Sequence, residues 1–164
     1  MIRNLTNPAL HEGCSRIKFA NISKRQVKSP RVYIRDSSIL HSLLGINAMI
    51  DLERSPVLGT SWEGMILEQL LTQLTPNNAT YWSTHGGAEL DLRIEINGQV
   101  VGFEIKRTTR PTVSKSMHSA LTDLNLNHLF AVHAGPHSFP LGDPITAISA
   151  TELLTGQNPC PTRA

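Results

Sequence analysis

The sequence contains few of the residues that mark disulfide-stapled or zinc-bound domains. Only two of its 164 residues are cysteines, Cys14 and Cys160, and they lie near opposite ends of the chain. Small secreted domains carry a dense cysteine framework, and structural zinc sites need closely spaced cysteines or histidines. Seven histidines are present, but they form no H-E-x-x-H or other compact ligand spacing. We therefore expect neither a disulfide framework nor a zinc centre, and we interpret His133, inside an apolar run, as a core or edge residue.

Long hydrophobic runs are also missing. No stretch approaches the ~20 apolar residues of a membrane span, and the N-terminus lacks the apolar core of a signal peptide. No G-x-x-x-x-G-K-[ST] motif occurs, so the sequence predicts no ATP site. Hydrophobic residues make up 40% of the chain and charged residues 17%, as in a globular domain. These features predict a cytoplasmic protein that makes no contact with a membrane.

The positive charge of the chain is small in total but unevenly placed. The formal net charge is only +2, yet residues 16–35 contain no acid and many basic side chains. These are Arg16, Lys18, Lys24, Arg25, Lys28, Arg31 and Arg35. A second basic group consists of Lys106, Arg107, Arg110 and Lys115. Either group could bind nucleic-acid phosphates, or it could be a solvated basic face or linker.

Hydrophobic periodicity predicts an α/β domain over residues 31–155. Residues 1–30 show no sustained periodicity, and we expect an extended basic arm or linker remnant there, with room for one short strand. Residues 156–164 are expected to form a frayed tail. The elements expected between them are a strand at 32–34, a helix from 36 or 37 to 44, a loop at 47–59, a long helix from 60 or 61 to 75, strands at 80–84, 89–96 and 99–107, a helix at 114–124, strands at 129–133 and 145–149, and a short terminal helix. The expected fold is a mixed β-sheet of four to five strands flanked by helices.

Asn97-Gly98, between two alternating runs, is the sequence signature of a type I′ β-hairpin. A two-residue turn at this position fixes which residues of the two strands lie opposite each other. The predicted pairs are Ile94–Val101, Leu92–Phe103 and Leu90–Ile105 on one face, and Arg93–Gly102, Asp91–Glu104 and Glu89–Lys106 on the other. Every pair on the first face is apolar, so the turn and the hydrophobic pattern predict the same register.

The predicted register places two carboxylates directly opposite each other. The Cβ atoms of Asp91 and Glu104 would be on the order of 5 Å apart, which is destabilising unless a cation lies between them or one binds a proton. Lys106 follows Glu104 by two residues and shares its face. Because Mg²⁺ and Mn²⁺ take oxygen ligands and commonly use one or two carboxylates, these residues predict a divalent metal site. Lys106 would orient or deprotonate the attacking water, or neutralise the developing charge.

A purely structural interpretation stands beside this one. Glu89 and Lys106 would form an ordinary cross-strand ion pair, with Asp91 and Glu104 hydrated on an open sheet face. Glu63 begins the apolar stripe of the long helix, which we expect beside the face opposite the apolar pairs, so that a third carboxylate points at the same place. Its own structural explanation is a first-turn acid favoured by the helix dipole. His85, just before Gly86-Gly87, is a further candidate neighbour of the site.

Glu63, Asp91 and Glu104-Ile105-Lys106 together resemble the PD-(D/E)xK, or restriction-endonuclease-like, superfamily. There a helix glutamate, a strand aspartate and an E-x-K on the next strand form the metal site. The proline that often precedes the aspartate is replaced here by Leu90. The resemblance implies that Asp91 and Glu104 are ligands of Mg²⁺ or Mn²⁺, and that Lys106 and Glu63 are catalytic residues.

One branch of this superfamily is more similar still: the C-terminal domain of unknown function in predicted prokaryotic AAA-type ATPases. The resemblance runs from Asn21 to Leu154 and rests on segments 24–33, 36–40, 61–63, 87–92 and 104–107. It implies that Glu89 is a characteristic neighbour of the site. Members place a P-loop ATPase before this region, so we expect a stand-alone derivative, a truncated gene product or the partner of a separate ATPase.

Two functions follow as predictions. The first is a metal-dependent nuclease, or a nuclease-derived domain that binds DNA or RNA, with Arg107, Arg110 and Lys115 as phosphate contacts. The second is a non-catalytic interaction module that docks on an AAA-type ATPase or another protein and retains the carboxylates as relics.

Overall fold

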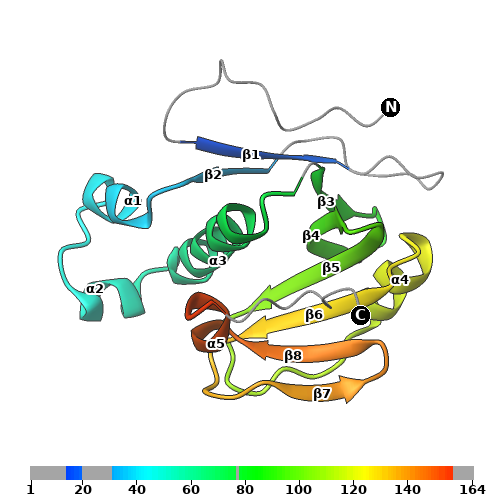
Figure 1. Cartoon of the computed structure of the whole chain (residues 1–164). Coiled ribbons are helices and arrows are strands. Elements are labelled where there is room, and N and C mark those ends of the chain that lie inside the picture. Colours follow the sequence, from blue (N-terminus) through cyan, green and yellow to red (C-terminus); the bar gives the residue numbers. More distant parts are fainter. Residues whose placement is uncertain (1–13, 20–30, 77, 157–164) are drawn as a thin grey trace.

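One mixed β-sheet with helices on both faces organises the chain (Figure 1). The computed structural model describes residues 14–19, 31–76 and 78–156, and the backbone alone for 14–19. In this part of the chain eight strands form the sheet in the order β2-β1-β3-β4-β5-β6-β8-β7. The strands are β1 (Cys14–Phe19), β2 (Arg31–Ile34), β3 (Ala79–Ser83), β4 (Glu89–Ile96), β5 (Gln99–Lys106), β6 (His128–His133), β7 (Phe139–Gly142) and β8 (Ile145–Ser149).

The mixed α/β class is confirmed, and the sheet is wider than expected. Strand β1 pairs antiparallel with β2 and parallel with β3, and it lies in the predicted arm. The rest of that arm and the predicted tail beyond Gly156 lie outside the described residues. Strand β7 was not predicted, because Pro140 weakens the strand pattern. Proline is tolerated there because β7 is an edge strand.

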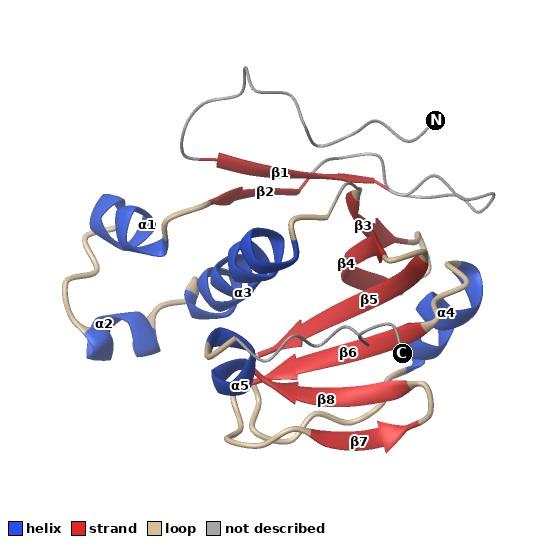
Figure 2. Ribbon diagram, viewed as in Figure 1, coloured by secondary structure: helices blue, strands red, loops and turns tan. Residues whose placement is uncertain are grey.

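Five helices complete the described part of the fold, and four were predicted (Figure 2). They are α1 (Ser37–Leu43), α2 (Met49–Arg54), α3 (Leu58–Leu74), α4 (Lys115–Asp123) and α5 (Ala150–Leu154). The side chain of Asp36 accepts a hydrogen bond from Ser38 N and caps α1, as the sequence predicts. The prediction of a loop over residues 47–59 is wrong, because α2 lies within it. This helix buries no residue and has no side-chain cap, so it leaves no apolar stripe in the sequence.

Two hydrophobic layers cover the two faces of the sheet. Helix α3 contributes Ile66, Leu67 and Leu70 to the first, which also contains Leu92 and Phe103. The second layer lies under α4 and contains Met117, Ala120, Leu129 and Trp82. The predicted apolar stripe of the long helix is therefore the surface by which α3 packs on the sheet.

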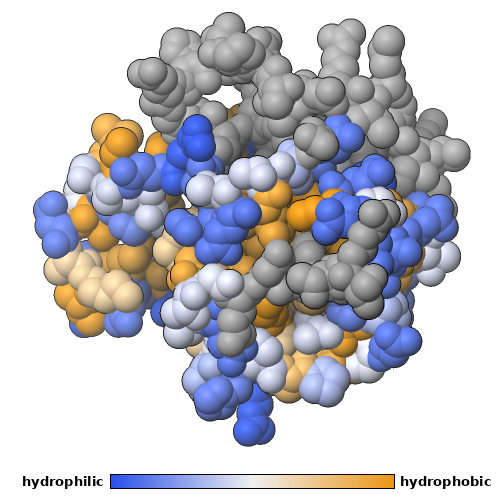
Figure 3. Space-filling model, viewed as in Figure 1, coloured by the Kyte–Doolittle hydropathy of each residue, from blue (hydrophilic) through white to orange (hydrophobic). Residues whose placement is uncertain are grey.

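Helices α1 and α2 expose an unusual amount of apolar surface. Leu43 is 73% exposed and Met49 66% exposed, and the patch also includes Ile39, Leu44 and Ile50. Figure 3 shows this apolar surface on the side of the molecule where α1 and α2 lie. Among the described helices, none has the length and hydropathy that crossing a membrane would require.

Candidate metal and nucleic-acid site

The β4–β5 hairpin has the predicted turn and register. Asn97 and Gly98 both have positive φ, at 52° and 76°, as a type I′ turn requires. Ile96 pairs with Gln99, and the ladder continues through Ile94–Val101 to Leu92–Phe103. The predicted register is therefore confirmed as far as Leu92 and Phe103, which are the immediate neighbours of Asp91 and Glu104.

The two strands part at these acids. No backbone pair joins Asp91 to Glu104 in the described registers. Beyond Leu92 and Phe103, β4 stays paired with β3, and β5 stays paired with β6. The N–H of Ile105 instead donates a hydrogen bond to Asp91 Oδ2 at 2.8 Å. A side-chain carboxylate thus replaces the missing carbonyl acceptor at the point where the ladder ends.

An irregularity in β4 turns Asp91 toward α3. Strand β3 pairs Thr80 with Arg93 but Trp82 with Leu90, so a β-bulge lies between these pairs. Its effect is that Leu92 packs in the layer under α3, whereas Leu90 packs in the layer under α4. Two expectations are therefore wrong. Leu90 does not share a face with Ile105, and α3 packs on the apolar face rather than beside the opposite one.

Arg31 connects three of the acids. Its Nη1 lies 3.1 Å from Glu63 Oε1 and 3.0 Å from Asp91 Oδ1. Its Nη2 lies 2.6 Å from Glu89 Oε2. The predicted Glu89–Lys106 ion pair is therefore replaced by a pair between Glu89 and Arg31, which reaches from β2 across to the site.

Tyr33 fixes the glutamate of the helix. Its hydroxyl donates a hydrogen bond to Glu63 Oε1, the same oxygen that Arg31 contacts. Burial raises the pKa of the Tyr33 hydroxyl, and the negative charge of Glu63 raises it further, so the hydroxyl remains a donor. Sequence analysis missed Tyr33 and the role of Arg31, because a pattern in β2 shows neither the bulge nor the position of α3. Their only signal is that both lie in segment 24–33, one of the segments that carry the resemblance.

Glu104 is buried, and one of its two oxygens has a partner among the described residues. Its Oε1 lies 2.9 Å from Lys106 Nζ. Its Oε2 is buried and has no hydrogen-bond partner among the described residues. Only 4% of Glu104 is exposed. A buried carboxylate oxygen without a partner costs free energy, so this atom marks a place where a positive group is missing.

The acidity of the two carboxyl groups reflects the same shortage of positive charge. Burial raises the pKa of Asp91, and the charges of Glu104 and Glu63 raise it further, to about 7. Burial also raises the pKa of Glu104, although its hydrogen bond with Lys106 works in the opposite direction. For Lys106, burial favours the neutral amine, but the hydrogen bond and charge of Glu104 prevail, so its pKa is raised and the side chain stays an ammonium.

The cluster fits a divalent cation in part. Among the described residues, Glu63, Glu89, Asp91 and Glu104 share two cationic partners, Arg31 and Lys106. Within residues 31–76 and 78–156, no three acidic, histidine or cysteine side chains are close enough together to hold a metal ion. Mg²⁺ commonly uses only one or two carboxylates and completes its shell with water and phosphate. The pair Asp91 and Glu104, with one free buried oxygen, meets that smaller requirement.

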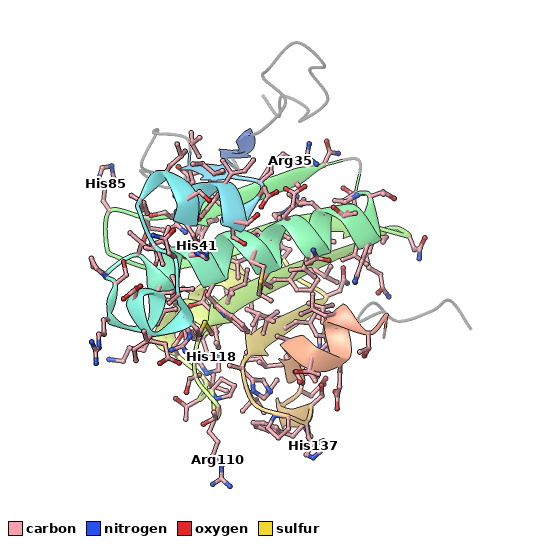
Figure 4. All side chains as sticks on the ribbon, turned by 90° about the vertical axis from the view of Figure 1, so that its left-hand side faces the viewer. Arg35, His41, His85, Arg110, His118 and His137 are labelled. Atoms are coloured by element: carbon pink, nitrogen blue, oxygen red, sulfur yellow. The ribbon has the colours of Figure 1, made fainter. Side chains whose placement is uncertain are left out.

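The structure does not bring the other predicted residues into contact with this cluster. His85 is exposed in the turn between β3 and β4, and Figure 4 shows it pointing away from the body of the molecule. Arg107, Arg110 and Lys115 are exposed on the segment after β5 and at the start of α4, and their contact with phosphates stays a prediction. His133 is fully buried, and its Nδ1 accepts a hydrogen bond from Gly135 N, which confirms it as a core residue.

Comparison with known proteins places the chain in a family. An uncharacterized protein of Mycobacterium tuberculosis and one of Mycobacterium bovis are each 55% identical to it over 137 residues. The match covers 84% of this chain but 31% of either relative, so the chain spans about a third of their length. No solved structure matches it. Residues 58–153, which contain Glu63, Asp91, Glu104 and Lys106, match a family described as "Domain of unknown function (DUF4143)", and the chain belongs to that family.

Proposed function

We propose that this domain is a metal-dependent nuclease of the restriction-endonuclease-like type, acting on DNA or RNA. One observation carries the proposal. Asp91 and Glu104 are both buried where β4 and β5 part, the charge of Glu104 raises the pKa of Asp91, and Glu104 Oε2 has no partner among the described residues. Natural proteins rarely bury two interacting carboxylates unless a positive group or a proton joins them. The order of Glu63, Asp91 and Glu104-Ile105-Lys106 along the chain supports the same conclusion.

The proposed reaction is hydrolysis of a phosphodiester bond. A water oxygen bonds to phosphorus, the bond from phosphorus to a sugar oxygen breaks, and the proton lost by the water balances the one gained by that sugar oxygen. A bound Mg²⁺ or Mn²⁺ would polarise the phosphate and make the water more acidic. Asp91 and Glu104 would hold the ion, and Glu63 would support it or its water.

Lys106 has one role that its surroundings favour. Its raised pKa keeps it protonated, so it suits charge stabilisation better than proton abstraction. It is 45% exposed at the side chain and lies 2.9 Å from Glu104, so its ammonium can reach a phosphate bound beside the acids. We therefore assign Lys106 to orienting the water and neutralising the charge that develops on the phosphate.

Cleavage assays test this proposal. The chain is incubated with single- and double-stranded DNA and RNA in Mn²⁺ or Mg²⁺, beside Lys106→Met and Asp91→Ala. We expect cleavage that EDTA stops, that Asp91→Ala abolishes and that Lys106→Met slows at least about 100-fold, the usual cost of removing one transition-state donor. Arg54→Gln, on the exposed side of α2, is the control and should cleave like the unmodified chain.

A second function is favoured by a different observation. The exposed apolar side chains of α1 and α2, with Leu43 and Met49 the most exposed, suit contact with another protein or domain. We propose as the alternative a non-catalytic module that docks on an AAA-type ATPase or another protein. All four substrates remaining intact after long incubation with Mn²⁺ would refute the nuclease and support this module.

A further inference from the structure

Arg31 already holds an oxygen that a divalent cation would need. Asp91 Oδ2 accepts a hydrogen bond from Ile105 N at 2.8 Å, and Asp91 Oδ1 lies 3.0 Å from Arg31 Nη1. Glu104 Oε1 is paired with Lys106, which leaves Oε2 as the one oxygen of the two carboxylates without a partner among the described residues. A cation that bridges Asp91 and Glu104 would therefore bind Asp91 either at Oδ1, beside Arg31, or at Oδ2, beside the hydrogen bond to the β5 backbone.

The guanidinium and a metal ion cannot both bind Asp91 Oδ1 closely. Mg²⁺ binds a carboxylate oxygen at about 2.0–2.1 Å, next to the space that a nitrogen 3.0 Å from the same oxygen fills. Two positive groups so close repel each other strongly where water is largely excluded. Asp91 is 6% exposed, so little solvent screens them. The cheaper exchange is the loss of the side-chain ion pair, because the hydrogen bond from Ile105 N–H to Asp91 also joins β5 to β4 where their backbone pairing ends.

We propose that Arg31 is a built-in cation that occupies the acid cluster in the absence of metal and competes with Mg²⁺ or Mn²⁺ for Asp91. This inference rests on the proposed function, since it takes Asp91 and Glu104 to be the metal ligands. Arg31 would then regulate the metal site, because the ion binds tightly only when the guanidinium of Arg31 moves away from Asp91. Glu63 and Glu89 raise the cost of that movement, because both also bind Arg31.

The position of Arg31 in the fold suits such a role. All four acids lie within residues 58–153, the part that matches the family, whereas Arg31 lies outside it on β2. Strand β2 joins the sheet through β1, whose parallel pairing with β3 consists of Lys18–Thr80 and Phe19–Tyr81. The blocking cation is therefore carried by a peripheral pair of strands, and a shift of β2 would remove it from Asp91 together with the hydrogen bond from Tyr33 to Glu63.

Titration with Mn²⁺ alone tests the competition. Calorimetry compares the unmodified chain with Arg31→Gln, which removes the charge and keeps a polar side chain. We expect Arg31→Gln to bind Mn²⁺ at least about fivefold more tightly, the lower end of the usual coupling between two linked ligands. Arg35→Gln is the matched control, because Arg35 follows β2 and pairs with Glu68, away from the cluster. Its affinity should equal that of the unmodified chain.

The outcomes separate this inference from the proposed function. Equal Mn²⁺ affinity with and without Arg31, abolished in both cases by Asp91→Ala, would overturn the competition and leave the metal site standing. Absence of any Asp91-dependent binding in either protein would overturn both. If Arg31→Gln does not fold because its acids repel one another, Arg31→Lys decides the question. Lysine cannot donate to two carboxylates from a planar fork, so its Mn²⁺ affinity should exceed that of the unmodified chain, and an equal affinity would refute the competition.

Discussion

The two ends of the β4–β5 hairpin are built on different principles. At the turn, Asn97 and Gly98 adopt the backbone that their residue types favour, and regular pairing follows from Ile96–Gln99 to Leu92–Phe103. At the other end the pairing stops, and charged side chains take its place: Asp91 accepts from the β5 backbone and binds Arg31. Local chemistry determines the first end, whereas groups from β2, α3 and β4 together determine the second.

The largest effect is expected at the turn end. Gly98→Ala should destabilise the chain by about 1–2 kcal/mol, the cost of placing a Cβ in the left-handed region. Nothing lies within 4 Å of the added Cβ, so the loss is purely conformational. Urea unfolding measures it. Gly59→Ala is the control, because its added Cβ is equally free and its φ is not in the left-handed region, so its stability should be unchanged or slightly raised.

This prediction also tests the contrast between the two ends. Mn²⁺ affinity should be the same in Gly98→Ala as in the unmodified chain, since the acid end is held by its own contacts. A turn substitution that alters Mn²⁺ affinity as strongly as it alters stability would show that the two ends are not independent.

At the acid end we expect a substitution that raises the stability of the chain, by less than Gly98→Ala lowers it. Glu104→Gln removes one of two buried like charges, so without metal it should stabilise the chain at pH 8 by about 1 kcal/mol, the low end of the cost of an unsatisfied buried group. The carboxyl pKa values are raised on folding. The folded state therefore binds more protons than the unfolded one, and stability falls as pH rises from about 4 through the raised pKa values.

Melting in EDTA at pH 6 and pH 8 checks the sign. The repulsion within the acid pair should lower the melting temperature of the unmodified chain between pH 6 and pH 8. The melting temperature of Glu104→Gln should fall less. Arg35→Gln, which alters an ion pair outside the cluster, should keep the pH dependence of the unmodified chain. A Glu104→Gln variant that is less stable at pH 8 and just as sensitive to pH would mean that Lys106 and Arg31 already neutralise the acids.

The difference between locally determined and distantly determined features also explains which parts of the structure can be predicted from the sequence. Turn residues, caps and periodic apolar positions act locally, so the hairpin register, the α1 cap at Asp36 and the stripe of α3 are all predictable. Helix α2 escapes prediction because it buries none of its residues and so has no periodic apolar stripe.

The candidate site is predictable in its residues but not in its connections. The hairpin register is predictable as far as Leu92–Phe103, the residues beside the two acids, and Lys106 pairs with Glu104 as its shared face implies. The bulge opposite Tyr81 and the reach of Arg31 from β2 depend on how distant segments pack, and no local pattern records them. Glu63 joins the cluster from the apolar side of the sheet because that bulge turns Asp91 toward α3.

The most direct measurement of the central claim is an electron paramagnetic resonance titration of free Mn²⁺ with the chain at pH 8, beside Asp91→Asn and Glu104→Gln. We expect one bound Mn²⁺ per chain that Mg²⁺ displaces, with binding weakened at least about tenfold in each variant, or 1.4 kcal/mol. We also expect weaker binding at pH 6, because protons compete for the same carboxyl groups. Binding that is unaffected by either substitution, or no binding by the unmodified chain, would contradict the assignment of Asp91 and Glu104 as a metal site.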